Sequence, residues 1–306
     1  MATRILLLGK EGQVGWQLQR ALAPLGTVHA IDREECDLSD ADALRRQLRE
    51  FAPQLIVNAA AYTAVDRAES EPELAQAINA QAPGLLAEEA ARSNALLVHY
   101  STDYVYDGTK NGAYVEDDAT GPQSVYGRTK LAGDQAVIAS GCRALIFRTS
   151  WVFGARGQNF VKTVLRLAAE REALSVVDDQ IGQPSPAAMI ADVSALVLAA
   201  LRSASRSTFD GAQLYHLAGQ GALSWNGFAR EIVAQARLTP GFELKLLPEN
   251  IAGIPTSGYP LPAARPANSR LDCSKLERDF GIELPDWRPY LSRMLQLLAL
   301  KKAHGY

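Results

Sequence analysis

A tyrosine and a lysine four residues apart, Tyr126 and Lys130, are the side chains in this sequence best suited to acid–base chemistry. On a helix, residues at i and i+4 share one face, so the ammonium can lie beneath the phenol and lower its pKa towards neutral pH. The residues that follow favour such a helix. A second pair with this spacing, Tyr106 and Lys110, encloses Asp-Gly-Thr and predicts a turn instead.

Two hydroxyls, Ser101 and Thr102, end an apolar run that predicts a buried strand. In a doubly wound sheet the carboxyl ends of strands line the ligand crevice, so Thr102 is expected to face the helix of Tyr126. A hydroxyl there can hydrogen-bond a carbonyl oxygen whose negative charge grows during hydride transfer. We therefore assign Thr102 to that oxygen and proton donation to Tyr126. Lys130 is expected to tune the phenol and to hold a nicotinamide ribose.

A glycine-rich loop predicts a dinucleotide site near the start of the chain. The sequence Gly-Lys-Glu-Gly-Gln-Val-Gly follows the first apolar run and opens a helical pattern. Such a loop presents the amides of a helix N-terminus to a pyrophosphate, and Gly12 lets the backbone approach the phosphates. The residues expected to bind the cofactor here are Gly9, Lys10, Gly12, Gln13, Val14 and Gly15.

The end of the second expected strand bears on which dinucleotide binds. Asp32 can accept hydrogen bonds from the adenosine ribose but would repel a 2′-phosphate. Arg33 and Lys10 could neutralise that phosphate, so the sequence permits both NADH and NADPH and favours NADPH. Asp37 and Leu38 are candidates for the adenine side, although a helix N-cap explains Asp37 equally well.

Alternating apolar and amphipathic stretches predict the elements that position these residues. Buried strands are expected at 4–9, 27–32, 55–60, 95–102 and 144–149. Helices are expected at 14–23, 41–51, 72–93 and 128–139. This order predicts right-handed βαβ crossovers and an α/β fold with a Rossmann-type, doubly wound parallel sheet.

After Trp151 the alternation of expected strands and helices becomes less regular. A segment with four prolines, residues 253–268, predicts an ordered loop over a site or an interface. We expect a dinucleotide-binding domain at 1–150 and a smaller mixed α/β substrate lobe at 151–306, from which some strands and helices return to the sheet. Further helices are expected at 160–171, 188–203, 225–237 and 284–302.

Composition limits the partners. The 306 residues carry 31 Lys and Arg against 34 Asp and Glu, so no basic surface is expected for a nucleic acid or an anionic membrane. The opening apolar run is too short for a secretory or membrane segment. Three dispersed cysteines predict a reducing, cytoplasmic location, and four scattered histidines lack metal-ligand spacing.

Longer motifs resemble the extended short-chain dehydrogenase/reductases and, within them, the dTDP-4-dehydrorhamnose reductases. The resemblance covers nearly the whole chain, and its most discriminating blocks are Asp-Gln-Ile-Gly-Gln-Pro at 179–184 and Arg-Pro-Ala-Asn-Ser-Arg at 265–270. It implies NAD(P)H-dependent reduction of the C4 ketone of dTDP-4-dehydro-L-rhamnose to dTDP-L-rhamnose, a precursor of cell-surface polysaccharides such as O-antigen.

The same resemblance implies further site residues. Asp103 and Trp151 become sugar-pocket residues. Arg265 becomes a contact to the nucleotide diphosphate, which a guanidinium can bind with two hydrogen bonds. Matching motifs add Ala59, Ala60, Ala61 and Tyr62 on the cofactor side, and Gln183 and Asn268 on the substrate side.

Some members of the family bind Mg2+ at a dimer contact through two glutamates. The matching positions here hold Gln17 and Ala188. Neither side chain is a carboxylate, and a hard cation keeps few oxygen ligands without them. We therefore expect no Mg2+ or other metal, and a monomer or weak homodimer.

Two other functions remain open from the sequence. A nucleotide-sugar 4-epimerase or 4,6-dehydratase would keep the fold and change the reaction. Related dehydratases place Asp-Glu directly after the active-site threonine, whereas here Asp103 is followed by Tyr104. A non-catalytic NADP-binding regulatory subunit would not need the proton donor that Tyr126 provides.

Overall fold

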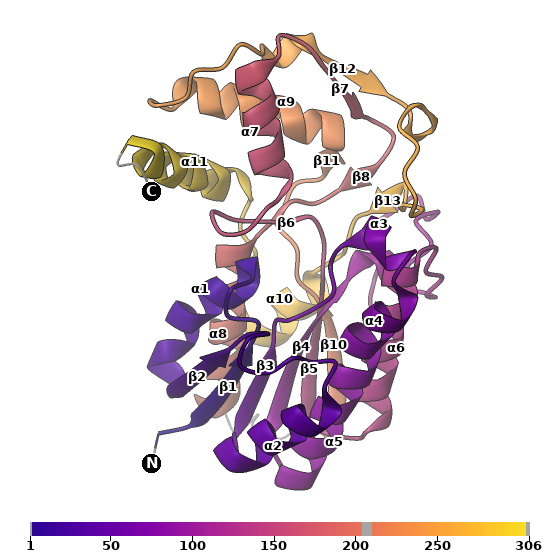
Figure 1. The fold of residues 1–306 in the computed structure, drawn as a ribbon, viewed down its shortest axis with the longest axis vertical. Helices are drawn as coiled ribbons and strands as arrows, with labels where there is room; N and C mark the ends of the chain where they lie inside the picture. The colour runs from indigo at the N-terminus through magenta and orange to yellow at the C-terminus, as the bar shows by residue number, and fades with distance from the viewer. Residues whose placement is uncertain (1, 204–209, 304–306) are drawn as a thin grey trace.

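The computed structural model describes residues 2–203 and 210–303, with a parallel sheet in the lower half and a smaller lobe above it (Figure 1). The six strands have the order β10-β5-β4-β3-β1-β2, and all neighbours are parallel. The predicted Rossmann-type α/β fold is confirmed. The strands are β1 (Arg4–Leu8), β2 (Thr27–Ile31), β3 (Leu55–Asn58), β4 (Leu96–Thr102), β5 (Ala144–Thr149) and β10 (Ala212–His216).

Helices cover both faces of this sheet. Alternate strand residues point to opposite faces, so Ile5 and Leu7 enter one core while Leu6 and Leu8 enter the other. That is why the strands are apolar throughout rather than alternating. The first core is closed by α1 (Gln13–Leu22), α8 (Ala187–Ser203) and α10 (Ser274–Phe280), and the second by α2 (Ala41–Phe51), α5 (Ala82–Ser93) and α6 (Val125–Ala139).

The single helix expected at 72–93 is interrupted. After α3 (Val65–Ala68), the chain forms α4 (Pro72–Gln76), a π-helical turn η2 (Ala77–Gln81) and then α5. Pro83 has no N–H, so it cannot donate to the carbonyl of Asn79 one turn earlier, and the helix widens there. The widened turn proves important for the site below.

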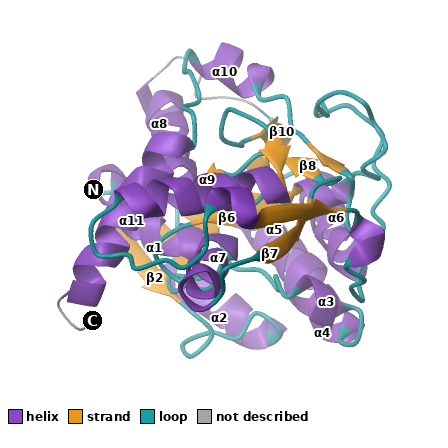
Figure 2. Cartoon of the chain, turned by 90° about the horizontal axis from the view of Figure 1, so that it is seen from above, coloured by secondary structure: helices purple, strands orange, loops and turns teal. Residues whose placement is uncertain are grey.

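The upper lobe has its own core of aliphatic and aromatic side chains, including Phe153 and Trp287. In the view from above, its helices lie in front of the sheet (Figure 2). The proline-dense segment is irregular only in its middle, because its ends pair as strands. The lobe's main elements are α7 (Phe160–Glu170), β7 (Leu174–Val177), α9 (Trp225–Leu238), β12 (Ile251–Ile254) and α11 (Arg288–Ala303).

Short elements join the two halves. Two of them, β6 (Val152–Phe153) and β9 (Ser185–Pro186), pair with each other in parallel. A small sheet forms from β11 (Leu223–Ser224), β8 (Ile181–Gly182) and β13 (Asn268–Ser269). Because β8 and β13 carry the two discriminating sequence blocks, this small sheet places both blocks above the edge of the main sheet.

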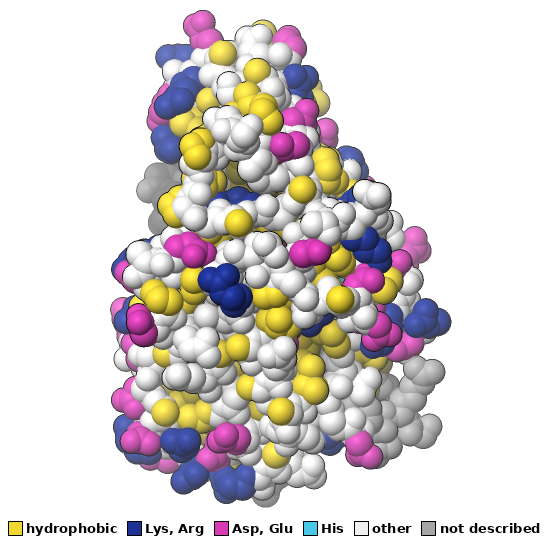
Figure 3. All heavy atoms as spheres, turned by 90° about the vertical axis from the view of Figure 1, so that its right-hand side faces the viewer, with side chains coloured by type: hydrophobic (Ala, Val, Ile, Leu, Met, Phe, Trp, Pro, Cys, Tyr) yellow, Lys and Arg dark blue, Asp and Glu magenta, His cyan; other side chains and the backbone are white. Residues whose placement is uncertain are grey.

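The surface and the cysteines match the composition. Basic and acidic side chains are interspersed on the face seen in Figure 3, without a patch of one sign. All three cysteines, Cys36, Cys142 and Cys273, are free thiols. Within residues 2–203 and 210–303, no helix has the length and hydrophobicity needed to span a bilayer.

Candidate functional site

Thr102 and Tyr126 lie together at the carboxyl edge of the sheet. Thr102 is the last residue of β4, and its hydroxyl donates to Asp103 Oδ1 (3.0 Å). Tyr126 lies in the first turn of α6. Burial raises the pKa of Tyr126 to about 12, and a hydrogen bond with Thr102 only partly opposes this shift. The pairing of these two hydroxyls matches the sequence prediction.

Lys130 lies differently from the sequence prediction. Its Nζ donates to the backbone carbonyl of Tyr100 (2.6 Å) and is 3.4 Å from His99 Nε2. The side chain is only 1% exposed, and burial lowers the pKa of Lys130 to about 8. The pKa of Tyr126 is raised rather than lowered because burial of the phenol dominates it.

Several backbone contacts fix the start of α6. The Ser124 hydroxyl caps the helix by accepting from Gly127 N (3.1 Å). The Glu69 carboxylate accepts from Val125 N (2.8 Å), where negative charge suits the helix dipole. A Cβ on Gly127 would lie 2.3 Å from the carbonyl oxygen of Tyr104, so only glycine allows this close packing.

Asp103 directly follows Thr102 at the end of β4. It is 3% exposed, and burial raises its pKa to about 6 although the hydroxyls of Ser269 and Thr102 favour the charged form. Tyr104 packs edge-on against Tyr126, with ring centroids 5.5 Å apart. The carboxylate of Asp103, predicted to line the sugar pocket, is thus adjacent to Tyr126, the predicted proton donor.

The glycine loop has the geometry of an anion cradle. Gly9 has φ +85°, and a Cβ there would lie 2.9 Å from the backbone of Ala60. A Cβ on Gly15 would lie 1.9 Å from Gly9 O. The N-cap residue of α1, Gly12, offers no side-chain acceptor to the first-turn amides of that helix. These amides suit a pyrophosphate, so the residues present fit a dinucleotide.

The charged residues at the end of β2 are paired with one another. Lys10 contacts the Glu35 carboxylate and lies 4.0 Å from Asp32, while Arg33 Nε donates to Asp37 Oδ2 (3.0 Å). The hydrogen bond from Lys10 is the main reason that the pKa of Glu35 falls to about 2. Sequence analysis missed Glu35. Its carboxylate contacts Lys10, which the sequence predicted would neutralise a 2′-phosphate.

The loop of Ala59, Ala60, Ala61 and Tyr62 is held by a residue that sequence analysis also missed. From the π-helical turn, Asn79 accepts from Tyr62 N (2.8 Å) and donates to Tyr62 O (3.0 Å). The same amide donates to Thr129 Oγ1 on α6 (3.2 Å). A single buried side chain therefore links the predicted cofactor loop to the helix of Tyr126, and the only sequence signal was an asparagine within a helical pattern.

On the substrate side, Trp151 is held between two surfaces. Its ring stacks on Trp225 with centroids 3.5 Å apart and planes 12° apart. On Gly182, a Cβ would lie 2.3 Å from the Trp151 ring. Sequence analysis did not single out Trp225, because the two tryptophans are distant in the chain. The stack fixes the indole where the lobe meets the sheet.

Arg265 lines a large cavity in the upper lobe. Its guanidinium makes a two-fold contact with Asp66 (2.6 and 3.0 Å). The cavity, about 960 Å³, lies among α7, β7, β12 and the proline-dense segment, and Trp225 and Tyr259 also line it. The contact with Asp66 was not predicted from the sequence. It fixes the orientation of the Arg265 guanidinium.

Gln183 and Asn268 hold loops rather than line this cavity. Gln183 Oε1 accepts from Leu271 N (2.7 Å). Asn268 Nδ2 donates to the carbonyl oxygens of Lys110 and Gly112 (2.7 Å each). Their side-chain bonds therefore secure the loops around β13, and a direct contact with substrate stays a prediction for both.

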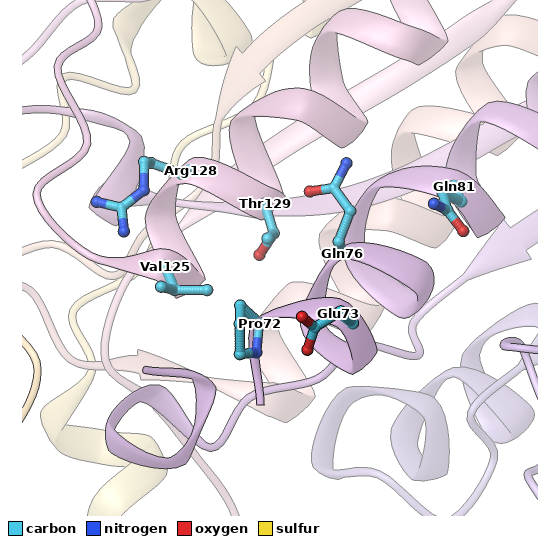
Figure 4. A pocket seen from close by; sticks show the side chains of 7 residues that line it. All are labelled: Pro72, Glu73, Gln76, Gln81, Val125, Arg128 and Thr129. Carbon is cyan, nitrogen blue, oxygen red and sulfur yellow. The ribbon is translucent and has the colours of Figure 1, made fainter. Parts of the chain in front are cut away.

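A second hollow, about 530 Å³, lies on the outer flank of α6 (Figure 4). Residues of α4, η2 and α6 line it: Pro72, Glu73, Gln76, Gln81, Val125, Arg128 and Thr129. None of the residues predicted for cofactor or substrate is among them. This hollow is therefore separate from the candidate active site.

The positions discussed for Mg2+ lie on two packed helices. Gln17 is on α1 and Ala188 on α8. Among the residues that the structure describes, no group of three His, Cys, Asp or Glu side chains could hold a metal. The expectation that no metal binds stays a prediction.

The chain matches known proteins over nearly its full length. The family model described as "RmlD substrate binding domain" matches residues 3–300. The dTDP-4-dehydrorhamnose reductase of Burkholderia thailandensis is 50% identical, covering 93% of this chain and 95% of that protein, and that of Salmonella typhimurium is 48% identical, covering 95% and 96%. The crystal structure of the Bacillus anthracis dTDP-4-dehydrorhamnose reductase in complex with NADP is 34% identical, with a TM-score of 0.86, over 96% of this chain and 99% of that one. The protein therefore belongs to the dTDP-4-dehydrorhamnose reductase family.

Proposed function

We propose that this protein reduces the C4 ketone of dTDP-4-dehydro-L-rhamnose to dTDP-L-rhamnose with NADPH or NADH. The observation that carries the proposal is the position of Thr102 at the carboxyl end of β4, where α6 packs and brings Tyr126 in its first turn, at the same edge of the sheet as the glycine loop after β1. A reduced nicotinamide dinucleotide supplies the hydride when bound. The chain itself must then bind both molecules, orient the ketone and deliver one proton.

Tyr126 is the proton donor in this proposal. With a pKa of about 12, its hydroxyl stays protonated at neutral pH and can donate to the C4 oxygen. Thr102 hydrogen-bonds the same oxygen as its negative charge grows. The ammonium of Lys130, one helical turn further along α6, favours the phenolate that donation leaves behind.

The dinucleotide would lie across the carboxyl ends of β1 and β2. The loop from Gly9 to Gly15 would hold the pyrophosphate, with Asp32 at the adenosine ribose and Asp37 and Leu38 at the adenine. Lys10 and Arg33 support NADPH, in line with the NADP bound to the Bacillus anthracis relative. The loop at 59–62 would face the nicotinamide end.

The sugar nucleotide would span both halves of the molecule. Asp103 and Trp151 would contact the sugar, and Arg265, held by Asp66, would face the diphosphate at the mouth of the large cavity. In this proposal residues 1–150 form most of the cofactor domain and 151–306 most of the substrate lobe. The expected state is a cytoplasmic monomer or weak homodimer that binds neither nucleic acid nor membrane.

The test is oxidation of NADPH or NADH by purified protein, followed as loss of absorbance. We expect it only when dTDP-4-dehydro-L-rhamnose is present, and steady-state assays with each cofactor give the preference. No oxidation with that substrate would overturn the proposal. Protein that purifies with stoichiometric NAD+ would instead indicate an epimerase, which keeps its cofactor through each cycle.

A further inference from the structure

A cluster of ionisable side chains is buried beneath the active-site edge, between α6 and strands β4 and β5. This buried charge cluster consists of Lys130, Asp134, Arg148 and His99, which are 1%, 0%, 3% and 0% exposed. Burying a charge without a partner costs several kcal/mol, on the order of the whole stability of a domain. The contacts of each member therefore decide whether it carries its charge.

Asp134 is the acidic member of the cluster. It lies one helical turn after Lys130 on α6. Its Oδ2 accepts from Arg148 Nε on β5 (3.1 Å), and its Oδ1 lies 3.8 Å from His99 Nε2 on β4. The Asp134 carboxylate thus pairs with Arg148 and approaches the same His99 nitrogen as the Lys130 ammonium, and its negative charge favours the protonated form of Lys130.

The histidines near the cluster add no charge at neutral pH. Burial and the nearby ammonium keep the pKa of His99 well below its usual value, and Asn58 Nδ2 lies 3.3 Å from its Nδ1. Arg148 Nη1 donates to the Tyr106 hydroxyl (2.9 Å), which in turn contacts His216 Nε2 (2.7 Å). Burial is also the main reason that the pKa of His216 falls to about 3.

Three further elements packed on α6 are the π-helical turn η2, α5 and the 3-10 turn η3 (Asp103–Val105), and their charged side chains pair outside this cluster. The π-helical turn η2 has no ionisable residue, and Asn79 faces α6 from it. On α5, the Glu89 carboxylate is paired with Arg49 of α2 and Arg92 of α5 (2.6 Å each). The turn η3 adds Asp103, whose partner is the Thr102 hydroxyl.

We propose that Asp134 is a positioning residue of the reaction: held by Arg148, it keeps the buried ammonium of Lys130 charged and in place behind Tyr126. The inference rests on the proposed function, in which that ammonium favours the phenolate. Without the carboxylate, two cations would share one dry space. Lys130 would then lose its proton, since a guanidinium does not deprotonate in proteins.

The test uses Asp134→Asn, which removes the charge and nearly preserves the shape. In the free enzyme, NMR of 13C-labelled lysine follows the Lys130 signal with pH, and the signal is identified by its absence in Lys130→Met. We expect the midpoint for Lys130, about 8 in the parent protein, to fall by about one pH unit. The alkaline limb of kcat should move with it, so that turnover drops about 5-fold at pH 8 and little at pH 6.

Two further variants keep the test decisive. If Asp134→Asn does not fold, Arg148→Gln serves instead: with the competing cation gone, the Asp134 carboxylate faces Lys130 alone and the Lys130 midpoint should rise. Asp134→Glu keeps the charge and should restore the midpoint. An unchanged Lys130 midpoint, or a loss of kcat that is uniform with pH, would overturn the inference. Failure of the parent protein to turn over substrate would overturn the proposed function, while the NMR midpoints would still test Asp134.

Discussion

Two sets of charged side chains lie at the carboxyl edge of the same sheet and behave differently. The cofactor-end cluster follows β2 and contains Lys10, Asp32, Arg33, Glu35 and Asp37, with Arg33 75% and Glu35 44% exposed. The buried charge cluster beneath α6 also combines Lys, Arg and Asp, with a histidine in place of the glutamate, and is almost fully enclosed. Both clusters hold one lysine and one arginine, yet only the buried one lies beneath the hydroxyls of Thr102 and Tyr126, which are proposed to react.

Solvent explains the difference. An exposed ion pair contributes about 0–1 kcal/mol and is weakened by salt, because water and counterions compete for each charge. In the enclosed cluster burial moves the pKa of Lys130 towards neutral pH, whereas the contact with Lys10 moves the pKa of exposed Glu35 away from it, to about 2. Enclosed charges can therefore set proton chemistry, whereas exposed charges can only adjust recognition. The predictions below test this division.

The largest expected effect is at the buried end. Tyr126→Phe removes the donated proton and leaves the ring, so cofactor affinity should stay within about two-fold while kcat falls by about 10²-fold or more. Single-turnover kinetics and cofactor titration measure the two quantities separately. Unchanged turnover would remove Tyr126 from the donor role.

Asp103→Asn should have the next largest effect, on stability. Because the folded pKa of about 6 lies above the ordinary aspartate pKa of 3.8, Asp103 stabilises the fold below about pH 4 and loses this contribution as the pH rises through 6. The ionised carboxylate then costs up to about 3 kcal/mol. Urea unfolding should show the variant more stable than the parent by about 1 kcal/mol at pH 4.5 and by about 3 kcal/mol at pH 8.

An Asp103 variant that is equally destabilised at both pH values would show that its hydrogen bonds outweigh its burial. Activity should fall in the same variant if Asp103 contacts the sugar, which would be a stability–activity trade-off. The unfolding free energy measures the cost of burying the Asp103 charge, and the activity measures its contribution to binding the sugar.

Much of this arrangement was predictable from the sequence. Apolar runs bounded by turn residues predicted the first five strands of the parallel sheet, and the turn residues around Tyr106 correctly excluded the second Tyr-Lys pair. The glycine loop was equally clear, because only glycine fits where a Cβ on Gly15 would meet the carbonyl of Gly9. These are local rules, in which a few neighbouring residues decide the backbone.

The contacts that were not predictable are tertiary. Nothing near Lys130 in sequence indicates that a carbonyl of β4 holds its ammonium, or that Asp134 meets Arg148 from β5. The expected pKa of Tyr126 was wrong in direction for this reason: i, i+4 spacing sets which face a residue shares, not how deeply it is buried. Asn79 was missed likewise, because its partners lie on other elements.

A smaller effect is expected at the cofactor end when the backbone changes. In Gly15→Ala the added Cβ would lie 1.9 Å from Gly9 O, so the loop must shift and lose its fit to a pyrophosphate. We expect the KM for the dinucleotide to rise about 10- to 100-fold, the range for overpacking of 1–3 kcal/mol, with a smaller change in kcat.

Gly112→Ala is the matched control for this prediction. The nearest atom to a Cβ at Gly112 is the flexible Cε of Lys110, at 3.9 Å. Its KM for the dinucleotide should stay at the parent value. A rise in both variants would point to a general sensitivity of the fold to added methyl groups rather than to the loop.

The smallest expected effect comes from changing charge at the cofactor end. Glu35→Gln releases Lys10 from its contact with the carboxylate, so the ammonium can turn to a 2′-phosphate. The KM for NADPH should fall about 3-fold, that for NADH should not change, and the gain should vanish near 1 M salt. Glu50→Gln on α2 removes the same charge away from the cluster and should leave both KM values alone. A Glu35→Gln effect as large as that of Gly15→Ala, or one that persists in high salt, would mean that the exposed charges act as strongly as the enclosed ones, and the division by burial would fail.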